Sequence, residues 1–142
     1  MPDHHTPTLI TRDRLENLCI QQGWHYFIDS QGQLGSRWED HTFFFIVSGN
    51  APEQRLEVWG QYMTWIDLEH LDTVRDIIDE SLRNRPWPNA FHSIDDAGHL
   101  RVHANLPIPY SGGATDVQLL QHIDCALGTT LSLFDQITQA IR

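Results

Sequence analysis

The chain has 142 residues, of which 40% are hydrophobic and 20% charged, so it can form one globular domain with its own core. Nine arginines and no lysine stand against nineteen acidic residues, which gives a formal net charge of −10. Nucleic acids and anionic membranes are bound mainly through cationic side chains. This charge balance therefore argues against both as partners.

The N-terminus, the apolar runs and the cysteines indicate the cellular compartment. The N-terminus has neither the basic nor the apolar region of a secretory signal, and no apolar run approaches the roughly 20 residues that span a bilayer. Cys19 and Cys125 lie far apart, each on the apolar side of an expected helix and without metal-ligand spacing. We interpret both as reduced core residues and expect a cytoplasmic protein.

The first half of the chain predicts one helix and four strands. We expect residues 1–9 to be a flexible tail and residues 10–142 to be a single domain. Thr11 can cap a first helix that ends at Gly23. The hydrophobic period then changes to two, which predicts a pair of short strands on either side of the turn "DSQGQ" (29–33).

The next two strands have no clearly polar face. In "FFFIV" (43–47) alternate side chains point to opposite sides, and all five are apolar. In the strand expected over 55–65, Trp59, Met63 and Trp65 share one face, and the opposite face is apolar as well. Because exposed aromatic side chains favour aggregation, we expect the three helices to cover both faces, or a second subunit to cover what they leave. A homodimer is therefore predicted.

The second half predicts two helices around a strand pair. Asp67 can cap a helix that must stop before "PWP" (86–88), because proline cannot donate to the helical ladder. Strands are expected over 89–94 and 99–106, and "LPIPYSGG" (106–113) is interpreted as a connector. A long final helix begins at Thr115, and its apolar stripe is widened by Leu119, Ala126 and Leu133.

The order of elements is therefore α-β-β-β-β-α-β-β-α. Most strands follow one another directly, whereas a parallel sheet needs a crossover helix between successive strands. The pattern favours an α+β fold in which three helices pack on an antiparallel sheet.

The one cluster that resembles a chemical site is histidine-rich. If Asp95–Gly98 form the loop of the last strand pair, His92, His99 and His103 share a surface with Arg101. A metal-dependent sensor or enzyme using these three histidines is one alternative, but a permanent cation among them would repel a metal ion. We expect a solvated strand face, with no metal and no cofactor. The sequence contains no GxSxG, HExxH, P-loop or GxGxxG motif.

Several stretches together resemble the YbjN domain family, specifically its actinobacterial-type members. They are "YFIDSQGQLGSRW", "FFFIVSG", "LEVWGQY", "NRPWPNAF", "DDAGHLRVHANL" and "GGATDVQLLQHI", and they run from Tyr26 towards the C-terminus. The resemblance implies a fold like that of type III secretion chaperones, with helices on an antiparallel sheet, usually dimeric. It also implies a role in sensory transduction regulation and brings no catalytic residues.

The functional hypothesis is a non-enzymatic, dimeric regulator or chaperone-like adaptor that binds another polypeptide. A small-molecule-binding domain is a further alternative that the sequence leaves open. The residues predicted for a protein-binding or dimer surface are the apolar ones that the core does not obviously need: Trp38, Trp59, Met63, Trp65, Leu119, Ala126 and Leu133.

Overall fold

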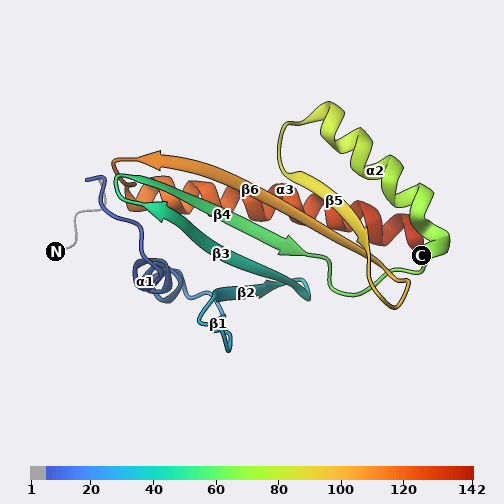
Figure 1. Cartoon of the computed structure of the whole chain (residues 1–142), viewed down its shortest axis with the longest axis horizontal. Coiled ribbons are helices and arrows are strands. Elements are labelled where there is room, and N and C mark those ends of the chain that lie inside the picture. Colours follow the sequence, from blue (N-terminus) through green and yellow to red (C-terminus); the bar gives the residue numbers. More distant parts are fainter. Residues whose placement is uncertain (1–5) are drawn as a thin grey trace.

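The computed structural model describes residues 6–142, which form one six-stranded sheet and three α-helices (Figure 1). The helices are α1 (Arg12–Gln22), α2 (Leu71–Asn84), preceded by the short 3-10 helix η1 (Leu68–His70), and α3 (Asp116–Ile141). The strands are β1 (Tyr26–Ile28), β2 (Leu34–Trp38), β3 (His41–Asn50), β4 (Glu53–Gln61), β5 (Asn89–Ile94) and β6 (Leu100–Ser111). The predicted α+β fold and the predicted order of elements are confirmed.

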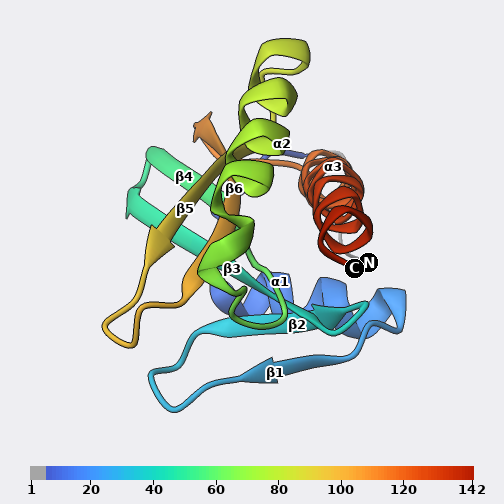
Figure 2. The same cartoon turned by 90° about the vertical axis from the view of Figure 1, so that its right-hand side faces the viewer.

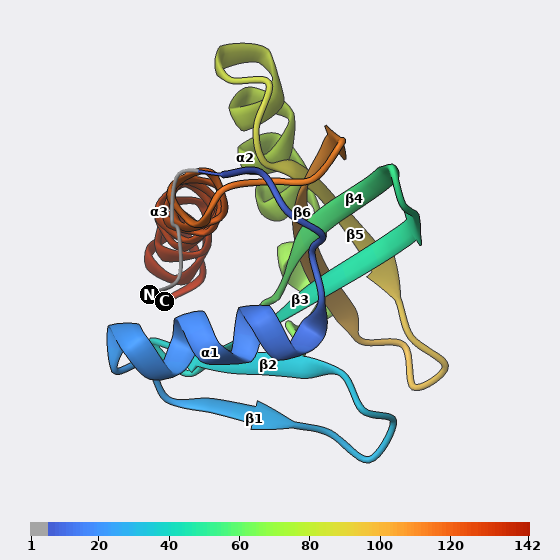
Figure 3. The same cartoon turned by 90° about the vertical axis from the view of Figure 1, so that its left-hand side faces the viewer.

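Every pair of neighbouring strands is antiparallel, and their order across the sheet is β1-β2-β3-β4-β6-β5. The sheet curls, and the helices lie inside the curve (Figure 2, Figure 3). One part of the core joins Leu15 of α1 and Leu119 of α3 to Phe43 and Leu56 of the sheet. Near the other end of α3 a second part joins α2 and α3 to β6.

The helices begin and end where their capping residues predict. The Thr11 hydroxyl accepts a hydrogen bond from the backbone N–H of Arg14 at 3.1 Å, and Gly23 ends α1 with a φ of +72°. Thr115 and Gln118 form a reciprocal capping box at the start of α3. The α2 helix stops at Asn84, before the prolines.

The long strands extend further than the sequence predicts. Residues 106–111, interpreted as a connector, belong to β6 and pair with β4 as far as Ser111. Pro107 and Pro109 are tolerated there because β5 pairs only with residues 100–105, so this part of β6 has a free edge on which no N–H is required.

The helices do not cover both faces of the sheet, so that part of the expectation is wrong. Buried residues from α1, α2 and α3 all pack on the face that carries Phe43, Val58 and Val102. No helix within residues 6–142 covers the other face. We call this second surface the open face.

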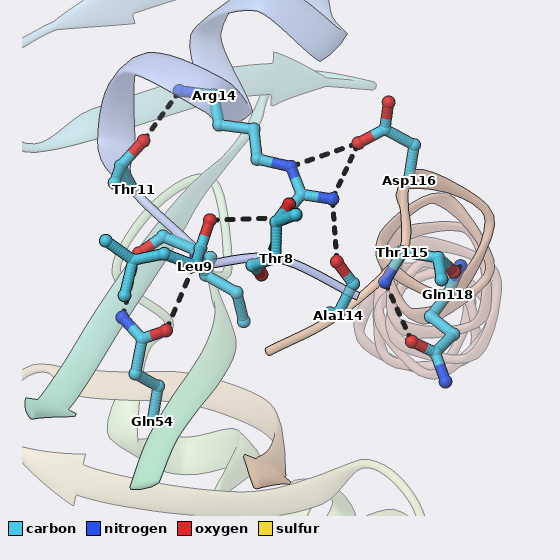
Figure 4. A network of polar contacts seen from close by, with 10 residues as sticks. Thr8, Leu9, Thr11, Arg14, Gln54, Ala114, Thr115, Asp116 and Gln118 are labelled. Carbon is cyan, nitrogen blue, oxygen red and sulfur yellow. Dashed lines mark hydrogen bonds and ion pairs between the residues drawn. The ribbon is translucent and has the colours of Figure 1, made fainter. Parts of the chain in front are cut away.

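An arginine ties the start of the described chain to the first and last helices (Figure 4). Arg14 donates to the Asp116 carboxylate at 2.8 and 3.0 Å and to the carbonyl oxygens of Thr8, Leu9 and Ala114. Thr8 also forms two backbone hydrogen bonds with Ala114. Residues 8 and 9, assigned to the predicted tail, therefore pack on the domain, and residues 1–5 of that tail lie outside the described residues.

Candidate protein-binding face

Strand register determines which side chains lie on the open face. The pairs Phe27↔Gly35, Gly35↔Phe44 and Phe44↔Trp59 connect β1, β2, β3 and β4. On the far side, Phe91 of β5 is opposite His103 of β6. Because paired residues point to the same side of a sheet, these aromatic residues share one surface. We call the set Phe27, Phe44, Trp59, Phe91 and His103 the aromatic stripe.

Members of the aromatic stripe contact one another across the strands. The ring centroids of Phe27 and Phe44 are 5.8 Å apart in an edge-to-face arrangement. Trp59 lies 5.2 Å from Phe91 and 5.4 Å from His103. Phe91 remains 37% exposed, and the other four are partly exposed. The register pair Phe44↔Trp59 places these two groups of rings side by side, and both are in contact with solvent.

Gly35 makes room for one end of the stripe. A Cβ atom at this position would lie 2.5 Å from Cζ of Phe27 and 2.8 Å from the Phe43 carbonyl oxygen. The Phe27 ring can therefore lie across the β2 backbone only because residue 35 has no side chain.

Polar groups beside Trp59 are partly withdrawn from water. The Glu57 side chain is only 17% exposed, and its Oε1 accepts a hydrogen bond from Nδ2 of Asn105 at 2.7 Å. Arg55 lies 3.9 Å from the other carboxylate oxygen. Oδ1 of Asn105 is buried and has no hydrogen-bond partner among residues 6–142. An unsatisfied buried acceptor is uncommon in folded proteins.

The predicted site residues fall into three groups. Trp59 is central to the aromatic stripe. Met63 and Trp65 are each 44% exposed beyond the end of β4, where the Trp65 ring stacks on His99 with centroids 3.9 Å apart.

The other four lie elsewhere. Trp38 packs on the helix-covered side of the sheet, edge-to-face with Trp24 at 5.7 Å. Leu119, Ala126 and Leu133 are at most 3% exposed and belong to the core of the single chain. The widened stripe of α3 is needed because this 26-residue helix contacts the sheet and α2 along its length. We therefore remove these four residues from the candidate surface.

Sequence reasoning did not assign Phe27, Phe44, Phe91 or His103 to a site. The signal was present in the period-two alternation, which separates Phe44 from Phe43 and Phe45. The alternation does not show which of the two faces the helices cover.

The proposed grouping of the three histidines is wrong. The hairpin loop contains five residues, because Ile94 pairs with Leu100 and not with His99. This shift by one position places His92 opposite Val102, on the other side of the sheet from His99 and His103. Among residues 6–142, no group of three or more His, Cys, Asp or Glu side chains could hold a metal ion.

Asp95 organises that loop. Its carboxylate accepts hydrogen bonds from the backbone N–H groups of Ala97 and His99 and from the Arg101 guanidinium. The His99 backbone hydrogen bond is the main reason that the pKa of Asp95 lies below its usual value. Asp95 and Arg101 thus have a structural role in the turn.

Two buried histidines on the helix-covered side are held neutral. His41 lies between Tyr62 and Phe134, and its Nδ1 accepts from the Met63 N–H at 2.9 Å. Nε2 of His122 lies 2.7 Å from the Leu106 carbonyl oxygen and must donate a hydrogen bond to it. In a neutral imidazole the other nitrogen is an acceptor, so Nδ1 accepts from the Tyr110 hydroxyl.

Burial shifts the titration of these groups. It lowers the pKa of His41, although the carboxylates of Glu39 and Asp40 oppose the shift. Burial also lowers the pKa of His122 and raises that of Tyr110 to about 12. Both imidazoles therefore belong to the core and depend on being uncharged.

Two hollows of the surface lie beside helices. One of about 360 Å³ lies between the end of α2 and α3 and is lined mainly by polar side chains, among them Glu80, Arg85 and Gln136. A second, of about 510 Å³, adjoins the structural pair of Arg14 and Asp116. Neither favours the small-molecule alternative over protein binding.

The geometry defines a class of protein: a two-layer α+β domain with all described helices on one face of an antiparallel sheet and an aromatic stripe on the other. A family model described as "YbjN: Putative bacterial sensory transduction regulator" matches residues 11–139. The chain therefore belongs to the YbjN family, which confirms the resemblance seen in the sequence.

Solved structures share the fold. A crystal structure of YbjN from E. coli, described as "a putative transcription regulator", superimposes with a TM-score of 0.67 at 12% sequence identity. The match covers 91% of this chain and 92% of that one. An uncharacterised protein from Methanothermobacter thermautotrophicus gives a TM-score of 0.59 at 13% identity, with 92% and 99% coverage. No curated protein matches the sequence.

Within residues 6–142 no helix combines the length and the apolar character needed to cross a bilayer.

Proposed function

We propose that this YbjN-family protein is a non-enzymatic, cytoplasmic regulator or chaperone-like adaptor that acts by binding a polypeptide on the open face of its sheet. The observation that carries the proposal is the aromatic stripe, which crosses the sheet from Phe27 to Phe91 and is not covered by any helix within residues 6–142. Aromatic residues are enriched in protein interfaces, and buried tryptophans often dominate the binding energy.

The surrounding chemistry supports binding more than catalysis. The buried His41 and His122 form hydrogen bonds in the core, and Asp95 stabilises a turn. Glu57 is engaged by Asn105 and adjoins Arg55. The family description is that of a regulator, which agrees with a protein that acts by binding another protein.

Affinity capture from native lysate tests the proposal. Wild-type protein, Trp59→Ala and the matched control Trp87→Ala would serve as baits, since Trp87 is 38% exposed in the connection between α2 and β5. We expect the bound polypeptides, whether another protein or further copies of this chain, to be lost from Trp59→Ala and retained by Trp87→Ala. Equal recovery by all three baits would contradict binding at the open face.

A further inference from the structure

The hollow between the end of α2 and α3 lies on the helix-covered side of the molecule and is separate from the open face. Its volume of about 360 Å³ falls within the range of roughly 300 to 1,000 Å³ that is typical of small-molecule sites. Two of its lining residues, Pro88 and Leu133, are buried, and every other lining side chain is polar. It therefore has the size of a site for a small, polar ligand.

Most of these polar side chains are not used by the fold. Those of Ser81, Asn84, Ser132 and Gln136 form no hydrogen bond with any other group of residues 6–142. The hydroxyl of Thr129, by contrast, donates to the Cys125 carbonyl oxygen of its own helix. Two hydroxyls and two amides are thus available to a ligand in one hollow, as donors and as acceptors.

The hollow also carries one charge of each sign. Glu80 lies on α2, and Arg85 follows the helix with an extended backbone (φ −145°, ψ 137°). Neither side chain forms an ion pair within the described part of the chain. Residues five apart do not share a row on a helix surface, which explains why the two charges stay separate. The carboxylate and the guanidinium are each left with their binding capacity.

The last turn of α2 adds acceptors to the same wall. In a continuing helix, the carbonyl oxygens of Leu82 and Asn84 would accept from the N–H groups of residues 86 and 88. Both of those residues are prolines, and neither carbonyl accepts a backbone hydrogen bond within residues 6–142. The carboxyl end of a helix carries a partial negative charge, which favours a cationic group.

We propose that this hollow binds a free amino acid, with the ligand carboxylate on Arg85 and the ligand ammonium on Glu80 and the last turn of α2. A guanidinium suits a carboxylate because it can donate two parallel hydrogen bonds. A simple anion would meet the Glu80 carboxylate, and a metal cation would meet the Arg85 guanidinium, so a ligand that carries both charges fits best. This site goes beyond the proposed function and would act alongside the open face.

Thermal unfolding in the presence of each standard L-amino acid tests the proposal on the purified full chain. At about 10 mM, an amino acid with a dissociation constant of about 0.1 mM should raise the Tm by roughly 5–10 °C. If none of them raises the Tm by more than about 1 °C, the proposal is overturned.

Calorimetric titration of the most stabilising amino acid then locates the site. Glu80→Gln and Arg85→Gln should each weaken its dissociation constant at least about tenfold, because each removes a charge-assisted hydrogen bond. The matched controls are Asp79→Asn and Arg83→Gln, which lie on the same helix but do not line the hollow, and they should stay within about twofold. All four positions are exposed, so the variants should fold. Equal effects of Arg85→Gln and Arg83→Gln would overturn the assignment.

Two derivatives of the same amino acid show which charge each residue contacts. Its methyl ester lacks the carboxylate charge, and its N-acetyl form lacks the ammonium, so each should bind the wild type at least about tenfold more weakly. Arg85→Gln should weaken the ester no further, and Glu80→Gln should weaken the N-acetyl form no further. An ester that binds as tightly as the amino acid would refute the zwitterion.

This proposal and the proposed function can fail separately, because they concern opposite sides of the sheet. Trp59→Ala should leave amino-acid binding unchanged, and Arg85→Gln should leave the fold intact for polypeptide capture. Loss of amino-acid binding in Trp59→Ala would contradict a site between α2 and α3.

Discussion

Replacing Arg14 by methionine should destabilise the protein far more than an equivalent change at Arg12. Arg14 is 18% exposed and Asp116 14%, and five hydrogen bonds join the guanidinium to Asp116 and to three carbonyl oxygens (Figure 4). Methionine retains much of the apolar stem but removes every one of these bonds.

The cost can be worked from the geometry. Removing one partner of a buried ion pair costs about 3–5 kcal/mol, and the residual exposure of both groups reduces this to about 2–4 kcal/mol. For a chain of this size, that loss corresponds to a fall in Tm of roughly 6–12 °C. Two of the three carbonyls, those of Thr8 and Ala114, keep a backbone donor, which is a further reason to expect less than the upper limit.

Urea unfolding followed by tryptophan fluorescence measures the difference in the free energy of unfolding. Arg12→Met is the control, because Arg12 is 48% exposed and donates to the Gly32 carbonyl and to Asp13 in the same region. It should cost less than about 1 kcal/mol. The reasoning is refuted if the two variants lose the same stability.

Two further expectations concern titration and thiol reactivity. The lowered pKa values of His41 and His122 mean that the unfolded chain binds more protons than the folded one below the ordinary histidine value of 6.5. The stability contributed by the neutral histidines is therefore complete above pH 6.5 and falls as the pH drops from 6.5 towards the folded-state pKa values. The slope is at most about 1.4 kcal/mol per pH unit for each histidine. Urea titrations at a series of pH values measure this change in the free energy of unfolding. Cys125 is exposed on α3, contrary to its predicted core position, whereas Cys19 is 1% exposed with its thiol pKa raised to about 11 by burial. Alkylation of the native protein near neutral pH should modify Cys125 first by a wide margin, and mass spectrometry of the digested product locates the label.

These expectations have their own controls. Replacing His41 by Gln should reduce the pH slope, because it removes one of the two buried histidines; a slope that His41→Gln does not change would contradict the linkage. For the thiols, denaturant should make both cysteines equally reactive, and equal rates in the native state would show that Cys19 is not protected.

The sequence by itself determines the helix ends and the alternation of side chains along the strands. Thr11, Gly23 and Thr115 delimit their helices through short-range hydrogen bonds and backbone geometry, which depend on neighbouring residues alone. The two-residue alternation of "FFFIV" also placed Phe43 and Phe44 on opposite faces. Together with the strands that follow one another directly, these signals were enough to predict the α+β class and the order of elements.

The site depended on long-range geometry. A one-residue difference in the hairpin register moved His92 to the other side of the sheet, and local sequence preferences did not distinguish a four-residue from a five-residue loop. The apolar patterns of Phe44, Trp59 and Leu119 are equally suited to a core or to an interface. Only the packing of all three described helices on one face buried Leu119 and left Trp59 at the open face, because helices choose a face through the sum of many distant contacts.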